Sequence, residues 1–254
     1  MTEARLELLA LDGIPEVRAG DDIGALIADA AGRDGIGLSG ADVLVVTQKV
    51  VSKAEGRRIE LGSVSPSPFA QGWGRRWEKD PRQVELVLRE SAEIVRMGLG
   101  GLIISRTRHG WVCANAGVDV SNVGGGEAAT LLPEDPDASA RRIRDALRER
   151  LGAAPAVIVS DSFGRAWRSG IVNVAIGVAG LEPLLDLRGT PDAAGMEMRV
   201  TIIAVADELA SAADLVGGKV EQRPVVVIRG YRYAASESAT AAELVMPRER
   251  DLFP

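Results

Sequence analysis

The spacing of apolar and polar residues along the chain predicts short strands interleaved with amphipathic helices. Residues 5–11 alternate between apolar and polar positions, as a half-buried strand does. Unbroken apolar runs, typical of strands buried on both faces, occupy 42–47, 156–160 and 224–228. Apolar residues recur at helical spacing over 21–32, 137–151 and 207–216. We therefore expect a sheet whose inner strands are covered on both sides.

Residues that interrupt regular structure divide the chain further. Residues 62–80 are rich in Gly, Pro, Ser and Trp, which predicts a surface loop or flap. Asp80 followed by Pro81 is typical of a helix start, and we expect that helix to run to about residue 97. Residues 118–127 are polar and rich in glycine, which predicts a flexible loop.

The order of these elements indicates the fold class. Strands and helices do not alternate strictly, which favours an α+β fold of mixed and antiparallel sheets with packed helices over a doubly wound fold. The glycine patterns of Rossmann and P-loop nucleotide sites are absent from the sequence. We expect residues 1–254 to form a single domain of two intimately joined subdomains, with a polar tail over about 232–254.

Composition narrows the class of protein. The formal net charge of −6 argues against a generic nucleic-acid binder. A single cysteine, Cys113, and a single histidine, His109, exclude an internal disulfide and sites that need several such ligands. No apolar run reaches the roughly 18 residues of a membrane span, and the acidic first segment lacks the apolar stretch of a signal peptide. We expect a cytoplasmic protein without membrane or nucleic-acid partners.

Two aspartates stand where short apolar segments end. Asp119 follows 116–118 and Asp161 follows the run 156–160, each with a small polar residue nearby. A carboxylate at the end of a buried strand is held rigidly, and hard oxygen ligands suit Mg²⁺ or Mn²⁺. Aspartates after strands are also common as turn residues and helix caps. The local pattern leaves both interpretations open.

Cationic residues indicate where an anion could bind. Arg165, Trp167 and Arg168 lie between glycines, and guanidinium groups match phosphate or carboxylate oxygens. The same run is also compatible with a surface turn in which an arginine covers the tryptophan. Lys49 and Lys53 follow a buried strand and share a face if that segment is extended, which suits either a phosphate contact or a solvated edge.

Seven segments, taken in order, carry a resemblance to a known family. They are GIPE (13–16), VVTQKVVSKAEG (45–56), KDPRQVELVLRES (79–91), AGVDVSNV (116–123), DSFGRAWRSG (161–170), AVADELASAADLVGGK (204–219) and PVVVIRG (224–230). With these segments the chain resembles the coenzyme F420-0:γ-glutamyl ligase family over residues 5 to about 231. It is most similar to the standalone form of the ligase, without the C-terminal nitroreductase-like domain that some bacterial relatives carry.

The resemblance implies an activity and its cofactors. Family members add L-glutamate to the lactyl carboxylate of the deazaflavin precursor F420-0, often extend the tail by γ-linkages, and convert GTP to GDP and phosphate. Formation of an acyl phosphate is the implied mechanism. Mg²⁺ or Mn²⁺ is required, with two ions expected, and K⁺ often helps. The implied assembly is a homodimer of α+β chains.

The resemblance also implies roles for individual residues. The implied GTP contacts are Ile14, Pro15, Glu16, Val17, Gln48, Lys53, Asn122, Gly217, Gly218 and Lys219. The implied metal ligands are Asp119, Asp161 and Ser162. Lys219 also falls where some relatives place a metal-coordinating polar residue, a role that a protonated lysine cannot fill. We expect Arg165 and Arg168 to contact the anionic groups of the acidic substrate.

Two other functions are compatible with the residues. A ligase of the same mechanism could act on a different acid, such as a folate-like cofactor tail, and a panel of acceptors would separate the two. A nucleotide-binding regulatory module would bind GTP without releasing GDP in the presence of any acceptor.

Overall fold

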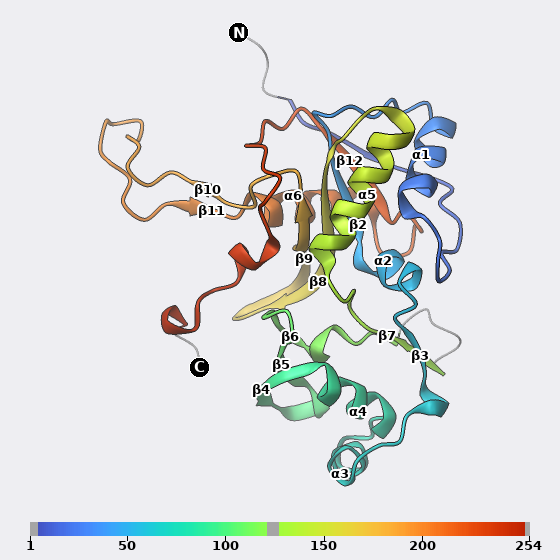
Figure 1. Cartoon of the computed structure of the whole chain (residues 1–254). Coiled ribbons are helices and arrows are strands. Elements are labelled where there is room, and N and C mark those ends of the chain that lie inside the picture. The colour runs from blue at the N-terminus through green and yellow to red at the C-terminus, as the bar shows by residue number, and fades with distance from the viewer. Residues whose placement is uncertain (1–4, 121–126, 252–254) are drawn as a thin grey trace.

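The computed structural model of the chain describes residues 5–120 and 127–251. A five-stranded mixed sheet forms its centre, in the order β1-β12-β2-β8-β9 (Figure 1). Its strands are β1 (Glu7–Ala10), β2 (Val43–Thr47), β8 (Ala156–Arg165), β9 (Arg168–Ala179) and β12 (Val225–Arg229). Strands β2 and β8 are parallel, and the other neighbouring pairs in this sheet are antiparallel. The predicted α+β class with mixed and antiparallel sheets is therefore confirmed.

Helices cover both faces of the central sheet. Helices α1 (Ile23–Arg33) and α5 (Pro136–Leu151) pack against each other on one face, and α6 (Val205–Gly217) packs on the other (Figure 1). Leu44 of β2 and Ile158 of β8 are completely inaccessible to solvent, as the unbroken apolar runs predict. Burial of this apolar surface is the main favourable contribution to folding.

Capping residues fix the ends of α1 and α5. The Asp22 carboxylate accepts a hydrogen bond from Ala25 N at 3.0 Å, which satisfies one of the free N–H groups of the first turn of α1. Helix α5 begins at Pro136 and ends at Leu151, and the next residue, Gly152, has a φ of 67°, a conformation that glycine adopts without strain. These helices begin and end within a residue or two of the predicted positions.

A smaller region lies below the central sheet in Figure 1 and is built from residues 58–120 and 127–130. It contains a two-stranded sheet of β3 (Arg58–Glu60) and β7 (Ala128–Thr130), and a three-stranded sheet of β4 (Ser91–Met97), β5 (Ile103–Thr107) and β6 (Val112–Ala114). Helices α3 (Pro68–Trp77) and α4 (Pro81–Glu90) complete it. Its buried residues form two clusters, distinct from the core around the central sheet, that include Leu61 and Leu86 in one and Ala70 and Ile103 in the other.

The prediction of a surface loop over residues 62–80 is wrong, because α3 occupies much of this segment. Ser67 caps the helix by accepting a hydrogen bond from Ala70 N at 3.3 Å. Phe69 and Trp73 stack on the same helix face with ring centroids 6.4 Å apart. Gly74 allows the backbone of Lys79 to approach closely, since a Cβ there would lie 2.7 Å from the Lys79 carbonyl oxygen. Glycine therefore marks a close contact inside a helix here rather than a loop.

Two other predicted boundaries also change. The helix that starts at Pro81 ends at Glu90, and β4 follows, because exposure then alternates from residue to residue as in a strand. Helix α6 begins at Val205, two residues before the predicted start at 207, and the short strand β11 (Ile202–Ile203) precedes it. Of the loop predicted over 118–127, residues 121–126 lie outside the described residues.

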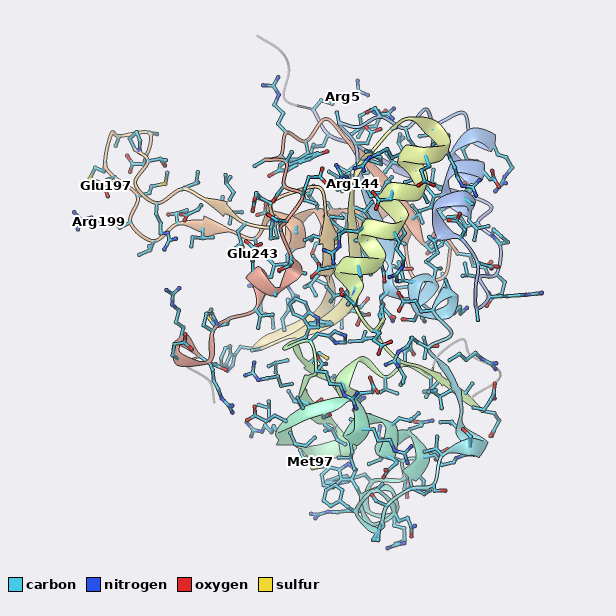
Figure 2. All side chains as sticks on the ribbon, in the orientation of Figure 1. Arg5, Met97, Arg144, Glu197, Arg199 and Glu243 are labelled. Atoms are coloured by element: carbon cyan, nitrogen blue, oxygen red, sulfur yellow. The ribbon has the colours of Figure 1, made fainter. Side chains whose placement is uncertain are left out.

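A two-stranded arm projects from the body of the molecule. It is formed by β10 (Leu185–Asp186) and β11, which pair in antiparallel fashion, and Figure 2 shows Glu197 and Arg199 at its far end. Met196 is 69% exposed and Val200 is 86% exposed, so the arm presents apolar side chains to solvent. No helix within the described parts of the chain has the length and apolar character to span a membrane.

Candidate active site

Separate stretches of the chain meet at one edge of the central sheet. Because β1 and β12 are antiparallel neighbours, the loop after β1 lies beside the loop before β12, and Leu11 N donates to Val225 O at 2.9 Å. At the end of β2, Thr47 N donates to Pro224 O at 2.9 Å. This edge therefore gathers the segments that the family resemblance implies in nucleotide binding, 14–17, 48–53 and 217–224.

Parallel pairing of β2 and β8 brings Asp161 to the same edge. Thr47 is the partner of Ser160 in the neighbouring strand. Beyond this pair, β2 turns directly into α2 (Gln48–Ala54), which carries Lys49. The expectation that the strand stops before Asp161 is wrong, because β8 continues to Arg165 by pairing with β9. Asp161 is thus held within β8 by its pairing with β9, one residue beyond the point where β2, the strand on the other side of β8, ends.

The second carboxylate reaches this edge from the smaller region. Asp119 is fixed by two main-chain hydrogen bonds with Thr130, at 3.0 and 2.7 Å. Its Oδ2 lies 2.8 Å from Lys49 Nζ, and the Asp119 and Lys49 side chains are each 29% exposed. The ion pair therefore joins the smaller region to the first turn of α2 and is partly shielded from water.

Charge is concentrated around Asp161. Burial raises the pKa of the Asp161 carboxyl to about 6, the backbone N–H of Ser162 opposes that rise, and the nearby charge of Asp119 adds to it. Lys219 and Lys49 lower the same pKa, so both ammonium groups act on this carboxyl. The charges of the two predicted metal ligands Asp119 and Asp161 therefore act on each other, with Lys49 and Lys219 nearby.

Cys113 packs beside the same cluster from β6. Burial, with a smaller contribution from the charge of Asp161, raises the pKa of its thiol to about 12. The side chain is buried, which suits a core residue rather than a nucleophile.

Ser162 lies at the end of a polar chain that runs through the neighbouring strand. Its Oγ donates to Asn173 Oδ1 at 2.6 Å, and Asn173 Nδ2 donates to Asp214 Oδ1 of α6 at 3.1 Å. Lys219 Nζ donates to the Ser162 oxygen. The predicted metal ligand Ser162 is thus in contact with an ammonium group.

The loop that includes 14–17 packs against α2. Lys53 Nζ lies 2.6 Å from Glu16 Oε1, and Gly20 N donates to Ala54 O at 2.8 Å. Val17 is buried, whereas Glu16 is exposed. Gln48 does not extend toward this loop, because its side chain is buried and its Oε1 accepts a hydrogen bond from Ser52 within the same helix.

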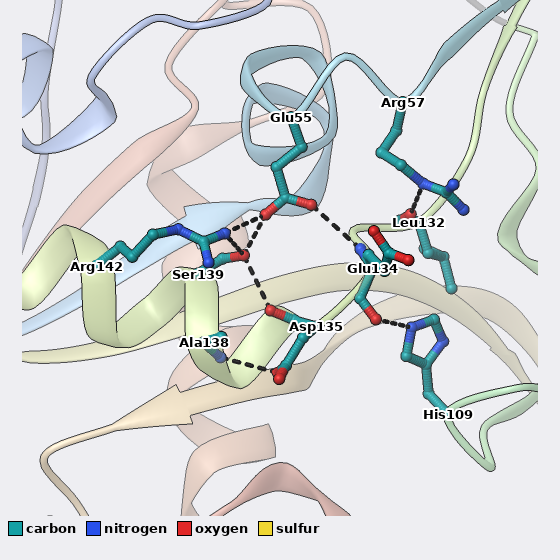
Figure 3. Close-up of polar contacts among 9 residues, drawn as sticks. All are labelled: Glu55, Arg57, His109, Leu132, Glu134, Asp135, Ala138, Ser139 and Arg142. Carbon is teal, nitrogen blue, oxygen red and sulfur yellow. Dashed lines mark hydrogen bonds and ion pairs between the residues drawn. The ribbon is translucent and has the colours of Figure 1, made fainter.

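Glu55 anchors the end of α2 to the start of α5 (Figure 3). Its carboxylate accepts hydrogen bonds from Ser139 Oγ, from Arg142 Nη2 at 2.6 Å and from Glu134 N at 3.1 Å. A surface cavity of about 340 Å³ lies on this side of α2, lined in part by Asp21, Glu55 and Arg142. None of the residues lining this cavity belongs to the cluster around Asp161, so we do not assign the nucleotide to it.

The predicted substrate contacts Arg165 and Arg168 lie at the tip of the β8–β9 hairpin. The two residues face each other across the turn, and Arg165 Nη2 donates to Ser169 O at 2.9 Å. Both are exposed, and Trp167 between them is 79% exposed. At about 3.3 Å per strand residue, Arg165 is about 13 Å along β8 from Asp161. Asn122, an implied nucleotide contact, lies outside the described residues.

Sequence reasoning did not identify Asn173, Asp214 or Glu55 as part of this arrangement. Asn173 lies in an apolar strand and Asp214 lies in an amphipathic helix, so the sequence pattern alone makes each look like an ordinary surface position. Glu55 belongs to the quoted segment 45–56, but nothing in that segment indicates a partner on α5. Only the pairing of β8 with β9 and the packing of α6 show these contacts.

The donor set at this edge fits one divalent cation. Mg²⁺ is usually held by one or two carboxylates together with phosphate and water oxygens, and Asp119 and Asp161 supply that number. Over residues 5–120 and 127–251, no group of three or more His, Cys, Asp and Glu side chains is arranged to hold a metal ion by itself. The two carboxylates would therefore share the ion with oxygens of a bound substrate.

Carboxylates and lysines that converge at a sheet edge are typical of enzymes that act on phosphate groups. The model of the F420-0:gamma-glutamyl ligase family matches residues 13–230, and the chain therefore belongs to that family. It is 48% identical over 250 residues to the coenzyme F420:L-glutamate ligase of Methanothermobacter thermautotrophicus, covering 98% of each chain. It is 45% identical to the ligase of that name from Methanopyrus kandleri, again over 98% of each chain. The Methanocaldococcus jannaschii ligase is 38% identical over 98% of this chain and 97% of its own.

Proposed function

We propose that this protein is an amino-acid ligase that joins L-glutamate to the lactyl carboxylate of F420-0 in coenzyme F420 biosynthesis, with conversion of GTP to GDP and phosphate. Membership of the family and the names of its relatives support glutamate ligation. The observation that carries the proposal is the convergence of Asp119 and Asp161 beside Lys49. This arrangement provides ligands for a divalent ion and positive charge for a polyphosphate.

A free carboxylate does not accept an amine at neutral pH, because its oxygen is a poor leaving group. Transfer of the GTP γ-phosphoryl group to the lactyl carboxylate would give an acyl phosphate and GDP. The glutamate amine would then attack the acyl carbon, forming the amide and releasing phosphate. Such a reaction depends on holding the nucleotide and the acceptor in line while charge develops on the phosphoryl oxygens.

The residues at the sheet edge suit these tasks. Lys53, which lies against the loop 14–17, would contact the nucleotide phosphates together with the glycine-containing segment 217–224. Asp119 and Asp161 would hold Mg²⁺ or Mn²⁺, which neutralises phosphate charge when bound. Because the net charge of the chain is −6, local cations are needed to attract polyanionic substrates.

The exposed hairpin would bind the acceptor. Arg165 ends β8, the strand that carries Asp161, and Arg168 begins its partner β9, so a substrate anion at the hairpin tip would align the rest of the acceptor along β8. The distance of about 13 Å between Arg165 and Asp161 suits an extended acceptor rather than the nucleotide.

We also propose a homodimer in which the arm of residues 185–203 covers a second copy of the chain. Its exposed Met196 and Val200 support this assembly, since apolar side chains on a projecting arm are typical of a contact surface. Light scattering coupled to size-exclusion chromatography would give twice the mass of 26.7 kDa for the intact protein. A Met196→Asp, Val200→Asp variant should elute as a monomer.

The activity is tested by mixing the purified protein with F420-0, L-glutamate, GTP, Mn²⁺ and K⁺. Mass spectrometry should find one added glutamyl unit with stoichiometric GDP, and further equal mass increments would report γ-linked extension. Replacement of F420-0 by folate-like acids tests whether another acceptor is used. GTP binding without GDP release for every acceptor would contradict the proposal and favour a regulatory module.

A further inference from the structure

The Lys219 ammonium donates a hydrogen bond to the Ser162 oxygen, a contact that is not expected if Ser162 is a metal ligand. The Asp214 carboxylate can only accept hydrogen bonds, so the Asn173 amide must direct Nδ2 toward it and Oδ1 toward Ser162. The Ser162 hydroxyl must therefore donate to Asn173, and its oxygen accepts from the Lys219 ammonium. The polarity of the whole chain from Lys219 to Asp214 is thus fixed.

The backbone around Lys219 supports this placement. Helix α6 ends at Gly217, and Gly218 follows it with a φ of 68°, in the region that favours glycine; the Gly218 N–H donates to Asp214 O at 3.1 Å. This turn sends Lys219 back toward β8, where its charge also acts on Asp161. Asp214 therefore contributes both to the end of α6 and to the polar chain that orients Ser162.

A divalent ion on the Ser162 oxygen would lie next to the Lys219 ammonium, and the two positive charges would repel each other. Asp119 also has an ammonium partner, Lys49 at 2.8 Å, but the negative charges of the Asp119 and Asp161 carboxylates offset such repulsion, whereas the Ser162 oxygen is neutral. Phosphoryl transfer is assisted by positive charges placed beside more than one phosphate oxygen. A fixed ammonium group can supply such a charge, as a metal ion can.

We propose that Lys219 takes the place of a second divalent cation, so that each chain binds one divalent ion, at Asp119 and Asp161, and directs its own ammonium at the phosphates from Ser162. This inference rests on the proposed function and revises the expectation of two ions with Ser162 as a ligand. It assigns to Ser162 the role of positioning Lys219.

The test counts Mn²⁺ ions bound per chain in the presence of saturating GDP, by the electron paramagnetic resonance signal of free Mn²⁺. The unmodified protein should bind one ion. Lys219→Gln removes the charge and provides a carbonyl oxygen, so this variant should bind two. Lys219→Met removes the charge but provides no oxygen ligand, so this variant should bind one ion. The double variant Lys219→Gln, Ser162→Ala lacks the Ser162 oxygen as a ligand and should also bind one ion.

Two bound ions in the unmodified protein, or a single ion in Lys219→Gln with an unchanged circular dichroism spectrum, would overturn the inference. As a second readout, the ligation rate of Lys219→Gln should depend on Mn²⁺ concentration with a higher order than that of the unmodified protein. Glutamyl transfer by a protein that binds two ions would reject only the role of Lys219. Absence of glutamyl transfer together with absence of bound Mn²⁺ would reject the proposed function as well.

Discussion

Lys49 Nζ lies 2.8 Å from Asp119 Oδ2, and this ion pair joins the first turn of α2 to the smaller region of the molecule. The Lys49 ammonium therefore lies beside Asp119, a candidate metal ligand, at the edge of the central sheet. Because both side chains are partly exposed, we expect the pair to contribute only about 1 kcal/mol to stability. Its main effect is to balance charge at the site.

Replacement of Lys49 should strengthen metal binding. In Lys49→Met the Asp119 carboxylate no longer has an ammonium partner, so a divalent ion no longer competes with one. We expect Mn²⁺ to bind roughly 5-fold more tightly in the absence of nucleotide, which corresponds to about 1 kcal/mol. Calorimetric titration would measure this change, and Lys79→Met, which alters the net charge equally at the end of α3, should leave the affinity unchanged.

Asp161→Asn should abolish ligation while preserving the fold. The variant keeps the shape of the side chain but loses the negative charge that holds a divalent ion, so we expect turnover to fall by about 10³-fold or more. Because burial makes the charged carboxylate unfavourable at this position, loss of the charge should not lower the melting temperature. Product formation and thermal unfolding measured on one preparation would test both parts. Turnover close to that of the unmodified protein would rule out the metal role of Asp161.

Lys53→Met should weaken GTP binding without destabilising the protein. The Lys53 side chain is 15% exposed, but its partner Glu16 is 74% exposed, so the pair contributes little to folding. Loss of a phosphate contact should raise the KM for GTP by about 10-fold or more, as expected for a charged hydrogen bond. Steady-state kinetics and the melting temperature separate the two effects. Glu16→Gln provides the matched control, and an equal rise in KM for both variants would indicate that Lys53 acts only through Glu16.

Asp42 and Arg229 predict how stability depends on pH. Burial raises the pKa of Asp42, but hydrogen bonds from Arg229 and Ser39 and the charge of Arg229 outweigh burial, so the net pKa lies below its usual value. A carboxyl with a lowered folded-state pKa stabilises the protein above its unfolded pKa of about 3.9 and loses that contribution as the pH falls through the folded value. The Asp42 oxygens lie 2.9 Å from the Arg229 Nε and Nη2 atoms, which holds β12 to the start of β2.

Asp42→Asn should therefore lower the unfolding free energy at pH 7 by about 2 kcal/mol, because it removes the carboxylate charge that faces the Arg229 guanidinium. The difference from the unmodified protein should stay constant above about pH 5 and shrink below about pH 4. Urea unfolding at several pH values would measure it. Asp145→Asn, which breaks an exposed pair with Arg148, should change stability little at any pH. A difference that grows in acid would contradict this assignment.

Local chemistry explains which parts of the fold could be predicted. The unbroken apolar runs of β2 and β12 and the capped helices α1 and α5 are encoded by neighbouring residues, and they appear as expected. Helix α3 was missed because Gly72 and Gly74 favour a loop, whereas packing against residues 79–81 makes a glycine useful there. Strand β4 was not predicted, because the helix that starts at Pro81 was extended to about residue 97 and so included the two-residue alternation after Glu90.

The sequence by itself determined the fold class, the inner strands, the capped helices and the segments that place the chain in its family, because these depend on residues close together along the chain. Only the tertiary structure decided which side chains meet. The contact of Lys49 with Asp119 depends on the pairing of Asp119 with Thr130 of β7 and on the packing of β7 against α2. The contact of Lys219 with Ser162 depends on the path of the chain at the end of α6. Hydrogen bonds and charges act over a few ångströms in space, and the distance between two residues along the chain does not specify that separation.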